Sequence, residues 1–162
     1  IVIAGSGPNY ESISERAKGL SNFKVLGWIN LAQAQYLSSI SDFMFAPYRE
    51  LEDFNIHIPN KFFDAMANSK PIITSISGVA RKLVSDNEIG LVYQSAEPDS
   101  LRNELLKILN EKYKLAQMGN RARELYENEY SLSKVYGNAV SHLVFLAKPL
   151  NDSPTRSEGL QE

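Results

Sequence analysis

Lys61 and Asp64 are the charged pair whose spacing is best suited to contact with a ligand. They lie three residues apart in the segment 58–67 and would share one face of a helix. Pro59 suits the first position of that helix, whose free N–H groups and positive dipole end would bind an anion such as a phosphate. Two interpretations stay open. One is a solvated ion pair, and the other is a nucleotide site with Lys61 toward phosphate and Asp64 toward ribose hydroxyls.

A glycine-rich turn, Gly5-Ser6-Gly7-Pro8, follows the first apolar run of the chain. Two glycines permit a positive φ and allow a ligand to approach the backbone N–H groups closely. The dinucleotide-binding fingerprint requires a third glycine, and Tyr10 occupies that position. The turn therefore fits both a ligand loop and an ordinary tight turn.

Two aromatic residues follow other apolar runs. Trp28, the single tryptophan, comes directly after Gly27 and suits either stacking on a planar base or covering the edge of a sheet, and Tyr48 has the same two interpretations. The Ser77-Gly78 pair fits a second phosphate-approach turn or an ordinary β–α turn. His57 is assigned to a loop rather than to a general base. The residues alone thus indicate a ligand that carries phosphate, without evidence of catalysis.

The elements that must position these residues alternate along the chain. Short runs that are apolar on both faces predict strands of a parallel sheet covered by helices. The expected strands are 1–4, 24–26, 43–46, 71–74 and 91–93, and the expected helices are 12–20, 31–39, 60–67, 80–84, 97–110, 112–128 and 132–147. This order predicts a doubly wound, mostly parallel, Rossmann-like α/β sheet with extra C-terminal helices, and ligands at the carboxyl ends of its strands.

Composition narrows the classes of function. The 162 residues include 17 Lys and Arg against 19 Asp and Glu, which gives no global attraction to nucleic acid. The absence of cysteine excludes a disulfide scaffold, a thiolate nucleophile and a cysteine-ligated metal. No triad of Ser, His and Asp, metal-ligand spacing or P-loop is present, and no apolar run is long enough to span a membrane.

The ends of the sequence suggest how the domain is bounded. The chain opens inside an apolar run at Ile1, so we expect it to be part of a longer protein. The segment 149–162 has almost no apolar residues and is expected to be a disordered tail. The last helix, 132–147, is apolar around more than half a turn, so we expect its second face to dock on something further. The domain is assigned to residues 1–148.

The order of these motifs resembles the C-terminal lobe of family 4 glycosyltransferases, over about residues 1–147. The matching segments are 3–8, 25–29, 41–42, 46–48, 58–67, 70–73, 77–78, 90–92, 118–123 and 129–131. The resemblance implies the GT-B architecture, in which two Rossmann-like lobes face each other and the C-terminal lobe holds a nucleotide-sugar donor. It also implies a retaining hexosyl transfer that needs no divalent metal or other cofactor.

Site residues carried over from the resemblance all concern the donor, and none is catalytic. The loop near the donor is matched by Gly5, Ser6 and Gly7, and the strand end that borders the base is matched by Gly27, Trp28 and Ile29, with Tyr48 beside it. The donor's phosphates or sugar would lie near Asn60 and Lys61. The glutamate that binds the ribose is matched by Asp64. The implied partners are a UDP- or GDP-sugar and a glycan or lipid-linked acceptor. The acceptor, and any peripheral membrane association, would involve an N-terminal lobe, at a cytoplasmic location or at the inner face of the membrane.

Three positions depart from the family pattern. Ile56 stands where the first glutamate of a pair is expected, Asp64 is one methylene shorter than the second, and Lys82 replaces the glutamate after the Ser-Gly turn. The family's diphosphate-neutralising Arg and Lys come from a β–α unit that would precede Ile1. Such charge stabilisation lowers the activation barrier by roughly several kcal/mol, about as much as an oxyanion-type contact. The isolated chain is therefore expected to be inactive.

Two other classes of protein stay open at this point. A nucleotide-sugar epimerase of GT-B fold would need carboxylates and histidines in its cleft, and this chain offers His57 alone. A non-catalytic α/β nucleotide-binding or regulator-like domain would need paired acids after its first strand, where this chain has Gly-Ser-Gly.

Overall fold

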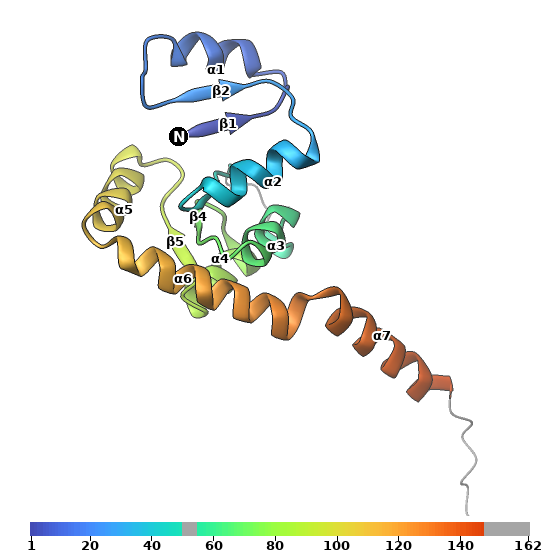
Figure 1. The fold of residues 1–162 in the computed structure, drawn as a ribbon. Coiled ribbons are helices and arrows are strands. Elements are labelled where there is room, and N and C mark those ends of the chain that lie inside the picture. The colour runs from blue at the N-terminus through green and yellow to red at the C-terminus, as the bar shows by residue number, and fades with distance from the viewer. Residues whose placement is uncertain (50–54, 148–162) are drawn as a thin grey trace, which may run out of the picture.

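The computed structural model describes residues 1–49 and 55–147, and these form alternating strands and helices as the sequence predicts (Figure 1). The strands are β1 (Val2–Ala4), β2 (Lys24–Leu26), β3 (Met44–Ala46), β4 (Ile72–Thr74) and β5 (Gly90–Val92). The helices are α1 (Tyr10–Ala17), α2 (Leu31–Ile40), α3 (Asn60–Ala67), α4 (Gly78–Asp86), α5 (Pro98–Asn110), α6 (Lys112–Leu125) and α7 (Leu132–Ala147). The expected tail, 149–162, lies outside the described residues.

The α/β class and the parallel strands are confirmed, but the strands form two sheets rather than one continuous sheet. β1 pairs with β2, and a second sheet has the order β3-β4-β5, with parallel pairing throughout. In Figure 1 the first sheet and α1 stand apart from the second sheet, and α2 lies between them. Because the strands belong to two sheets, the carboxyl ends that carry the expected ligand loops divide into two groups.

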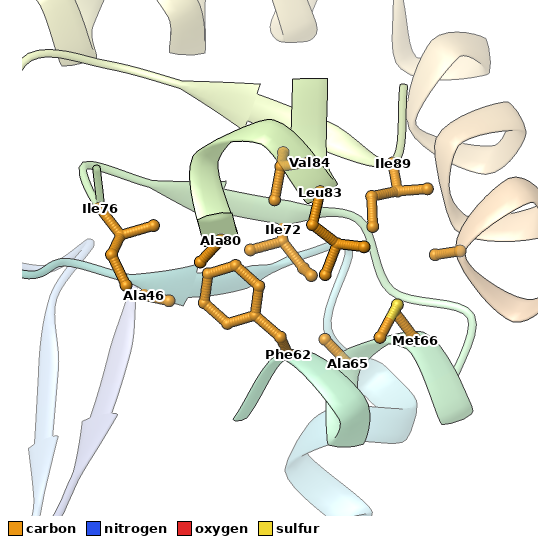
Figure 2. Close-up of a cluster of buried hydrophobic side chains, with 11 residues drawn as sticks. Ala46, Phe62, Ala65, Met66, Ile72, Ile76, Ala80, Leu83, Val84 and Ile89 are labelled. Atoms are coloured by element: carbon orange, nitrogen blue, oxygen red, sulfur yellow. The ribbon is translucent and has the colours of Figure 1, made fainter. Parts of the chain in front are cut away.

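The main hydrophobic core covers one face of the second sheet (Figure 2). Phe62, Ala65 and Met66 of α3 point toward Ala80, Leu83 and Val84 of α4, with Ile72 of β4 between them. β4 lies between β3 and β5, and all three of its residues are buried. Because β4 is buried and pairs with β3 up to Ala46 and Thr74, the loops that follow both strands begin at the same edge of the sheet.

A second cluster covers the opposite face of this sheet. Ile73 packs there with Tyr93, Ile108 of α5 and Leu115 of α6. Neighbouring strand residues point to opposite faces, so Ile72 and Ile73 serve the two clusters in turn. The second sheet is therefore covered on both faces, as a doubly wound fold requires.

Helix boundaries differ from the sequence prediction by two residues or more in α1, expected over 12–20, in α4, expected over 80–84, and in α6, expected over 112–128. α1 begins at Tyr10 rather than at residue 12, because the N–H of Tyr10 donates to the carbonyl of Gly7 at 2.9 Å and closes the first turn. The helix expected over 112–128 is α-helical to Leu125 and continues as a π-helical turn, η2 (Tyr126–Tyr130). The wider turn redirects the chain before α7 starts.

α7 projects away from the rest of the domain (Figure 1). Its bounds match the prediction, and every one of its described residues is exposed, including Phe145 at 70% and Leu132 at 72%. Against the part of the chain that the structure describes, the helix therefore buries no face. Within the described ranges, none of the helices combines the length and the apolar character needed to cross a bilayer.

Candidate functional site

The first group of expected donor residues lies at the carboxyl ends of β1 and β2. The N–H of Gly5 donates to the carbonyls of Leu26 and Gly27 at 3.3 and 3.0 Å, so the structure brings Gly5 and Gly27 together. Gly5 has a φ of +148°, which L side chains rarely adopt. Its glycine is therefore required by the backbone alone, whether or not a ligand approaches.

Ser6 and Gly7 form the exposed outer part of this loop. A Cβ built on Gly7 would meet nothing within 4 Å, so the space above this backbone is open. A Cβ on Gly27 would lie 3.9 Å from the Tyr10 hydroxyl, which puts that hydroxyl at the rim of the loop. An open glycine beside a hydroxyl suits the approach of a polar ligand to the main chain.

Trp28 is 75% exposed, and Ile29 is half-buried. This exposure argues against the interpretation in which Trp28 covers the edge of a sheet, because three quarters of the residue's surface is open to solvent. The next residue, Asn30, caps α2: its Oδ1 accepts from the N–H of Gln33, and its own N–H donates to Gln33 Oε1, both at 2.9 Å. This capping box fixes the end of the loop that carries Trp28.

Tyr48 belongs to a second group, at the carboxyl ends of β3, β4 and β5. Its backbone N–H donates to Ser75 Oγ at 2.9 Å, and its carbonyl accepts from Ser75 Oγ at 2.8 Å and Ser95 Oγ at 3.2 Å. The side chain is half-buried, and burial raises the pKa of the Tyr48 phenol above its usual value of 10.0. The backbone of Tyr48 is thereby held at the end of β3, and the raised pKa favours the neutral phenol.

The amino end of α3 carries the remaining expected residues. Pro59 is the cap of the helix rather than its first residue, with φ −65° and ψ 145°. Asn60, Lys61 and Asp64 are exposed, because Phe62, Ala65 and Met66 turn the opposite side of α3 into the core. Across the residues that the structure describes, Lys61 and Asp64 form no ion pair. The structure therefore gives no support to the interpretation of this pair as a solvated ion pair.

The Ser77-Gly78 turn is closed against another loop. Gly78 has a φ of +68°, and a Cβ there would collide with the backbone carbonyl of Asn55. The glycine thus permits the chain before α3 to press against the start of α4. This favours an ordinary β–α turn at Gly78 over a phosphate-approach turn, because the space is already occupied.

The structure does not bring the two groups of expected residues into one site. The Gly5–Gly7 and Gly27–Ile29 loops belong to the β1–β2 sheet, whereas Tyr48 and the α3 residues belong to the other sheet. The hydrogen bonds of the Gly5 N–H stay within the first sheet, and those between Tyr48 and the two serines stay within the second group. Part of the loop 47–60 falls on 50–54, outside the described residues.

Sequence reasoning missed the two serines that hold Tyr48. Ser75 directly follows β4 and is buried, while Ser95 follows β5. The only available signal was their position just past a strand's carboxyl end. His57 and Ile56 are exposed, and within the ranges 1–49 and 55–147 His57 forms no ion pair.

Comparison with known proteins identifies the family. The family model described as "Glycosyl transferases group 1" matches residues 1–125. A comparison with curated protein sequences found no match.

Similar solved structures share the fold. Anabaena HepE in complex with UDP-glucose has a TM-score of 0.71 at 18% identity, over 89% of this chain and 40% of that one. Sucrose-phosphate synthase from Thermosynechococcus elongatus has a TM-score of 0.69 at 18% identity, over 90% of this chain and 38% of that one. WaaG, a glycosyltransferase involved in lipopolysaccharide biosynthesis, has a TM-score of 0.62 at 19% identity, over 85% and 36%.

The chain spans 36–40% of the length of these three solved structures. Those neighbours support a domain of GT-B type, with parallel strands and covering helices. The family model covers residues 1–125 of 162, which is well over half of the chain. The chain therefore belongs to the glycosyl transferases group 1 family.

Proposed function

We propose that this chain is the donor-binding, C-terminal lobe of a family 4 glycosyltransferase. The whole enzyme would transfer a hexose from UDP- or GDP-sugar to a glycan or lipid-linked acceptor, with retention and without a metal ion. The acceptor would bind a second, N-terminal lobe, in the cytoplasm or at the inner face of the membrane. In the same proposal the donor-binding lobe spans residues 1–148.

One observation carries the proposal: Asn60, Lys61 and Asp64 are exposed on α3, which begins at the carboxyl side of the β3-β4-β5 sheet. Ligands of open α/β sheets bind at that side. The helix dipole and Lys61 favour the donor's phosphates, and the Asp64 carboxylate can accept hydrogen bonds from two vicinal ribose hydroxyls. HepE, which has the same fold, was solved with UDP-glucose, and this supports a nucleotide-sugar as the ligand.

The loops on the β1–β2 sheet would complete the donor site. Open space above Gly7 admits a ligand to the backbone, and the exposed Trp28 indole with Ile29 offers an apolar surface for the base. In this proposal Ser6 and Gly27 shape the same loops, and Tyr48 borders the donor from the other sheet. None of these residues breaks or forms a covalent bond, so the chain alone should not turn over substrate.

A titration of the isotope-labelled chain tests the proposal. UDP, GDP and their hexose conjugates are added while backbone amide shifts are followed. Shifts should gather at Gly5–Gly7, Gly27–Ile29 and Asn60–Asp64, with dissociation constants of about 1 mM. Asp64→Ala should weaken binding, and Asp86→Ala, at the far end of α4, should not. Shifts that ignore Asp64→Ala, or no shifts with any nucleotide, would count against the assignment.

A further inference from the structure

The ammonium group of Lys70 joins two parts of the chain that are distant in sequence. Lys70 Nζ donates to the carbonyls of Ser41 and Ser39, at 2.7 and 3.1 Å, although these residues lie 29 and 31 positions earlier. Both carbonyls belong to the carboxyl end of α2, and the last carbonyls of a helix have no partner within it. The last turn of α2 has no basic residue of its own. Lys70 therefore supplies the positive charge that is favourable at this end of a helix.

The backbone of Lys70 is fixed to α3 and to the second sheet. Its N–H donates to the Ala65 carbonyl at 2.9 Å, near the end of α3. The next residue, Pro71, is fully buried, and its carbonyl accepts from the Met44 N–H at 2.9 Å, at the start of β3. The Lys70 side chain thus reaches α2 from the part of the molecule that holds the second group of expected donor residues.

The opposite end of α2 leads to the first group of expected donor residues. Asn30 and Gln33 form the capping box that begins the helix, and the loop 27–29, with Trp28, directly precedes it. In Figure 1 α2 lies between the two sheets. Its 10 residues extend over roughly 15 Å at the usual rise of a helix. α2 therefore connects the two groups.

α2 is held at its ends rather than along its sides. In the described part of the chain, neither hydrophobic cluster includes a side chain of α2, and the helix has no buried residue. The segment 41–43 links it to β3 and begins with an extended Ser41, at φ −84° and ψ 150°. Each residue of such a segment has rotatable backbone angles, so α2 can turn about its carboxyl end. The two hydrogen bonds from Lys70 restrict that rotation.

We propose that Lys70 is a positioning residue for the donor site. By holding the carboxyl end of α2, its ammonium group sets how far the loop with Trp28 lies from Tyr48 and from the amino end of α3. Lys70 contacts no ligand in this role. The consequence for the donor rests on the proposed function, whereas the placement of α2 rests on hydrogen bonds within the chain.

The chemistry of the lysine side chain defines the variants to compare. An ammonium group on a flexible stem can donate to more than one carbonyl at once. Lys70→Met keeps a long side chain but removes the charge and both hydrogen bonds, whereas Lys70→Arg keeps a cation with several N–H donors. Lys114→Met is the matched control, because Lys114 pairs with Glu111 at the start of its own helix, α6, and joins no other element to it.

Distances between spin labels test the placement without any nucleotide. The chain contains no cysteine, so Arg16→Cys on α1 and Arg102→Cys on α5 provide a unique pair of labelling positions. Both arginines are exposed; α1 lies beside the first sheet, and α5 packs on the second (Figure 1). The distance distribution is measured in the doubly labelled 162-residue chain and in the same chain with each lysine variant.

One narrow distance is expected in the chain that keeps Lys70, and Lys70→Met should widen the distribution at least about twofold. Lys70→Arg and Lys114→Met should keep the narrow distance. If Lys70→Met does not fold, Lys70→Gln, whose shorter, neutral side chain also lacks the ammonium group, takes its place. An unchanged distribution in a folded variant without the ammonium group would overturn the proposal.

UDP binding to the same samples gives a readout that a purely stabilising contact would not change. When only the correctly placed fraction of molecules binds a ligand, the apparent affinity falls by that fraction. Lys70→Met should weaken UDP binding about tenfold if that fraction falls to about one tenth, and saturating UDP should narrow its distance distribution again. A wide distribution with unchanged UDP affinity would overturn the positioning role. If UDP does not bind the chain that keeps Lys70, the proposed function is contradicted, and the distance distributions still decide the placement of α2.

Discussion

Ser75 and the backbone of Tyr48 exchange two hydrogen bonds. Ser75 Oγ accepts from the Tyr48 N–H at 2.9 Å and donates to the Tyr48 carbonyl at 2.8 Å. The two residues follow neighbouring strands at the point where the β3–β4 ladder ends. The Ser75 side chain thus extends the hydrogen bonding between β3 and β4 one step beyond the end of the strands. It holds the start of the loop that carries Tyr48 although the residues are 27 positions apart.

Ser75→Ala should therefore destabilise the domain and loosen Tyr48. The substitution leaves the Tyr48 N–H without this partner, and a lost partner of a buried polar group costs about 1–3 kcal/mol of unfolding free energy. Ser95→Ala is the matched control, because Ser95 is exposed and donates one bond, at 3.2 Å, to the same carbonyl. It should cost under about 0.5 kcal/mol in urea unfolding. Equal losses for the two variants would contradict the role given to Ser75.

Gly7→Ala should separate ligand binding from folding. A Cβ at Gly7 meets nothing within 4 Å, so the unfolding free energy should change by less than about 0.5 kcal/mol. If a donor nucleotide approaches this backbone, the added methyl group should weaken UDP binding about tenfold, which corresponds to roughly 1.4 kcal/mol.

Gly5→Ala provides the contrast, since its φ of +148° makes any side chain strained. That variant should lose stability in the absence of ligand. Calorimetric titration with UDP and urea unfolding of both variants distinguish the effects. Unchanged UDP affinity in Gly7→Ala would remove this loop from the donor site.

Periodicity was sufficient to predict most elements of the fold. Three-residue strands such as β4 stood out because both faces are apolar, and α3 matched its predicted bounds because Phe62, Ala65 and Met66 repeat at helical spacing. The division into two sheets was not predictable, because strand pairing depends on contacts distant in sequence. Each run shows only that it is a strand, not which strand lies beside it.

The candidate site was predictable only in part, for a similar reason. The exposure of Lys61 and Asp64 follows from the helical pattern, because the apolar residues of α3 occupy the other face of the helix, which is buried in the core. The support of Tyr48 by Ser75 and Ser95 joins three strand ends, and serine has no periodic signature. The contact between Gly78 and Asn55 likewise depends on a loop whose path the sequence pattern does not specify.

Gly78→Ala should be one of the most damaging small substitutions in the chain. The φ of +68° is unfavourable for alanine, and its Cβ would meet the Asn55 backbone, which has no flexible side chain to move aside. We expect a loss of at least about 1–3 kcal/mol of unfolding free energy. Gly7→Ala serves as the control in the same urea experiment. A Gly78→Ala variant as stable as that control would show that the Asn55 segment moves away freely.

Arg123 of α6 connects this helix to the end of α3. Its Nη1 donates to the Ala67 carbonyl, its Nε donates to Glu127 Oε1 at 2.7 Å, and its guanidinium lies 5.9 Å from the centre of the Tyr126 ring. Lysine has no planar fork to reach both acceptors, so Arg123→Lys should cost about 1 kcal/mol. Glu127→Gln removes only the exposed ion pair and should cost under about 0.5 kcal/mol. If Glu127→Gln lowers the unfolding free energy more than Arg123→Lys does, the contact with the Ala67 carbonyl is not what holds α6 against α3.

Tyr48 should make the stability of the domain fall in alkaline solution. Burial raises the pKa of its phenol above 10.0, so the unfolded chain loses this proton at a lower pH than the folded chain does. The stabilising difference is complete below about pH 10 and is lost as the pH rises through the folded pKa. Tyr48→Phe cannot ionise, so its unfolding free energy should decline less between about pH 8 and pH 11. Tyr113→Phe, which removes an exposed phenol of α6, should retain the wild-type decline. A parallel decline in the Tyr48 variant would mean that burial at the end of β3 does not govern this ionisation.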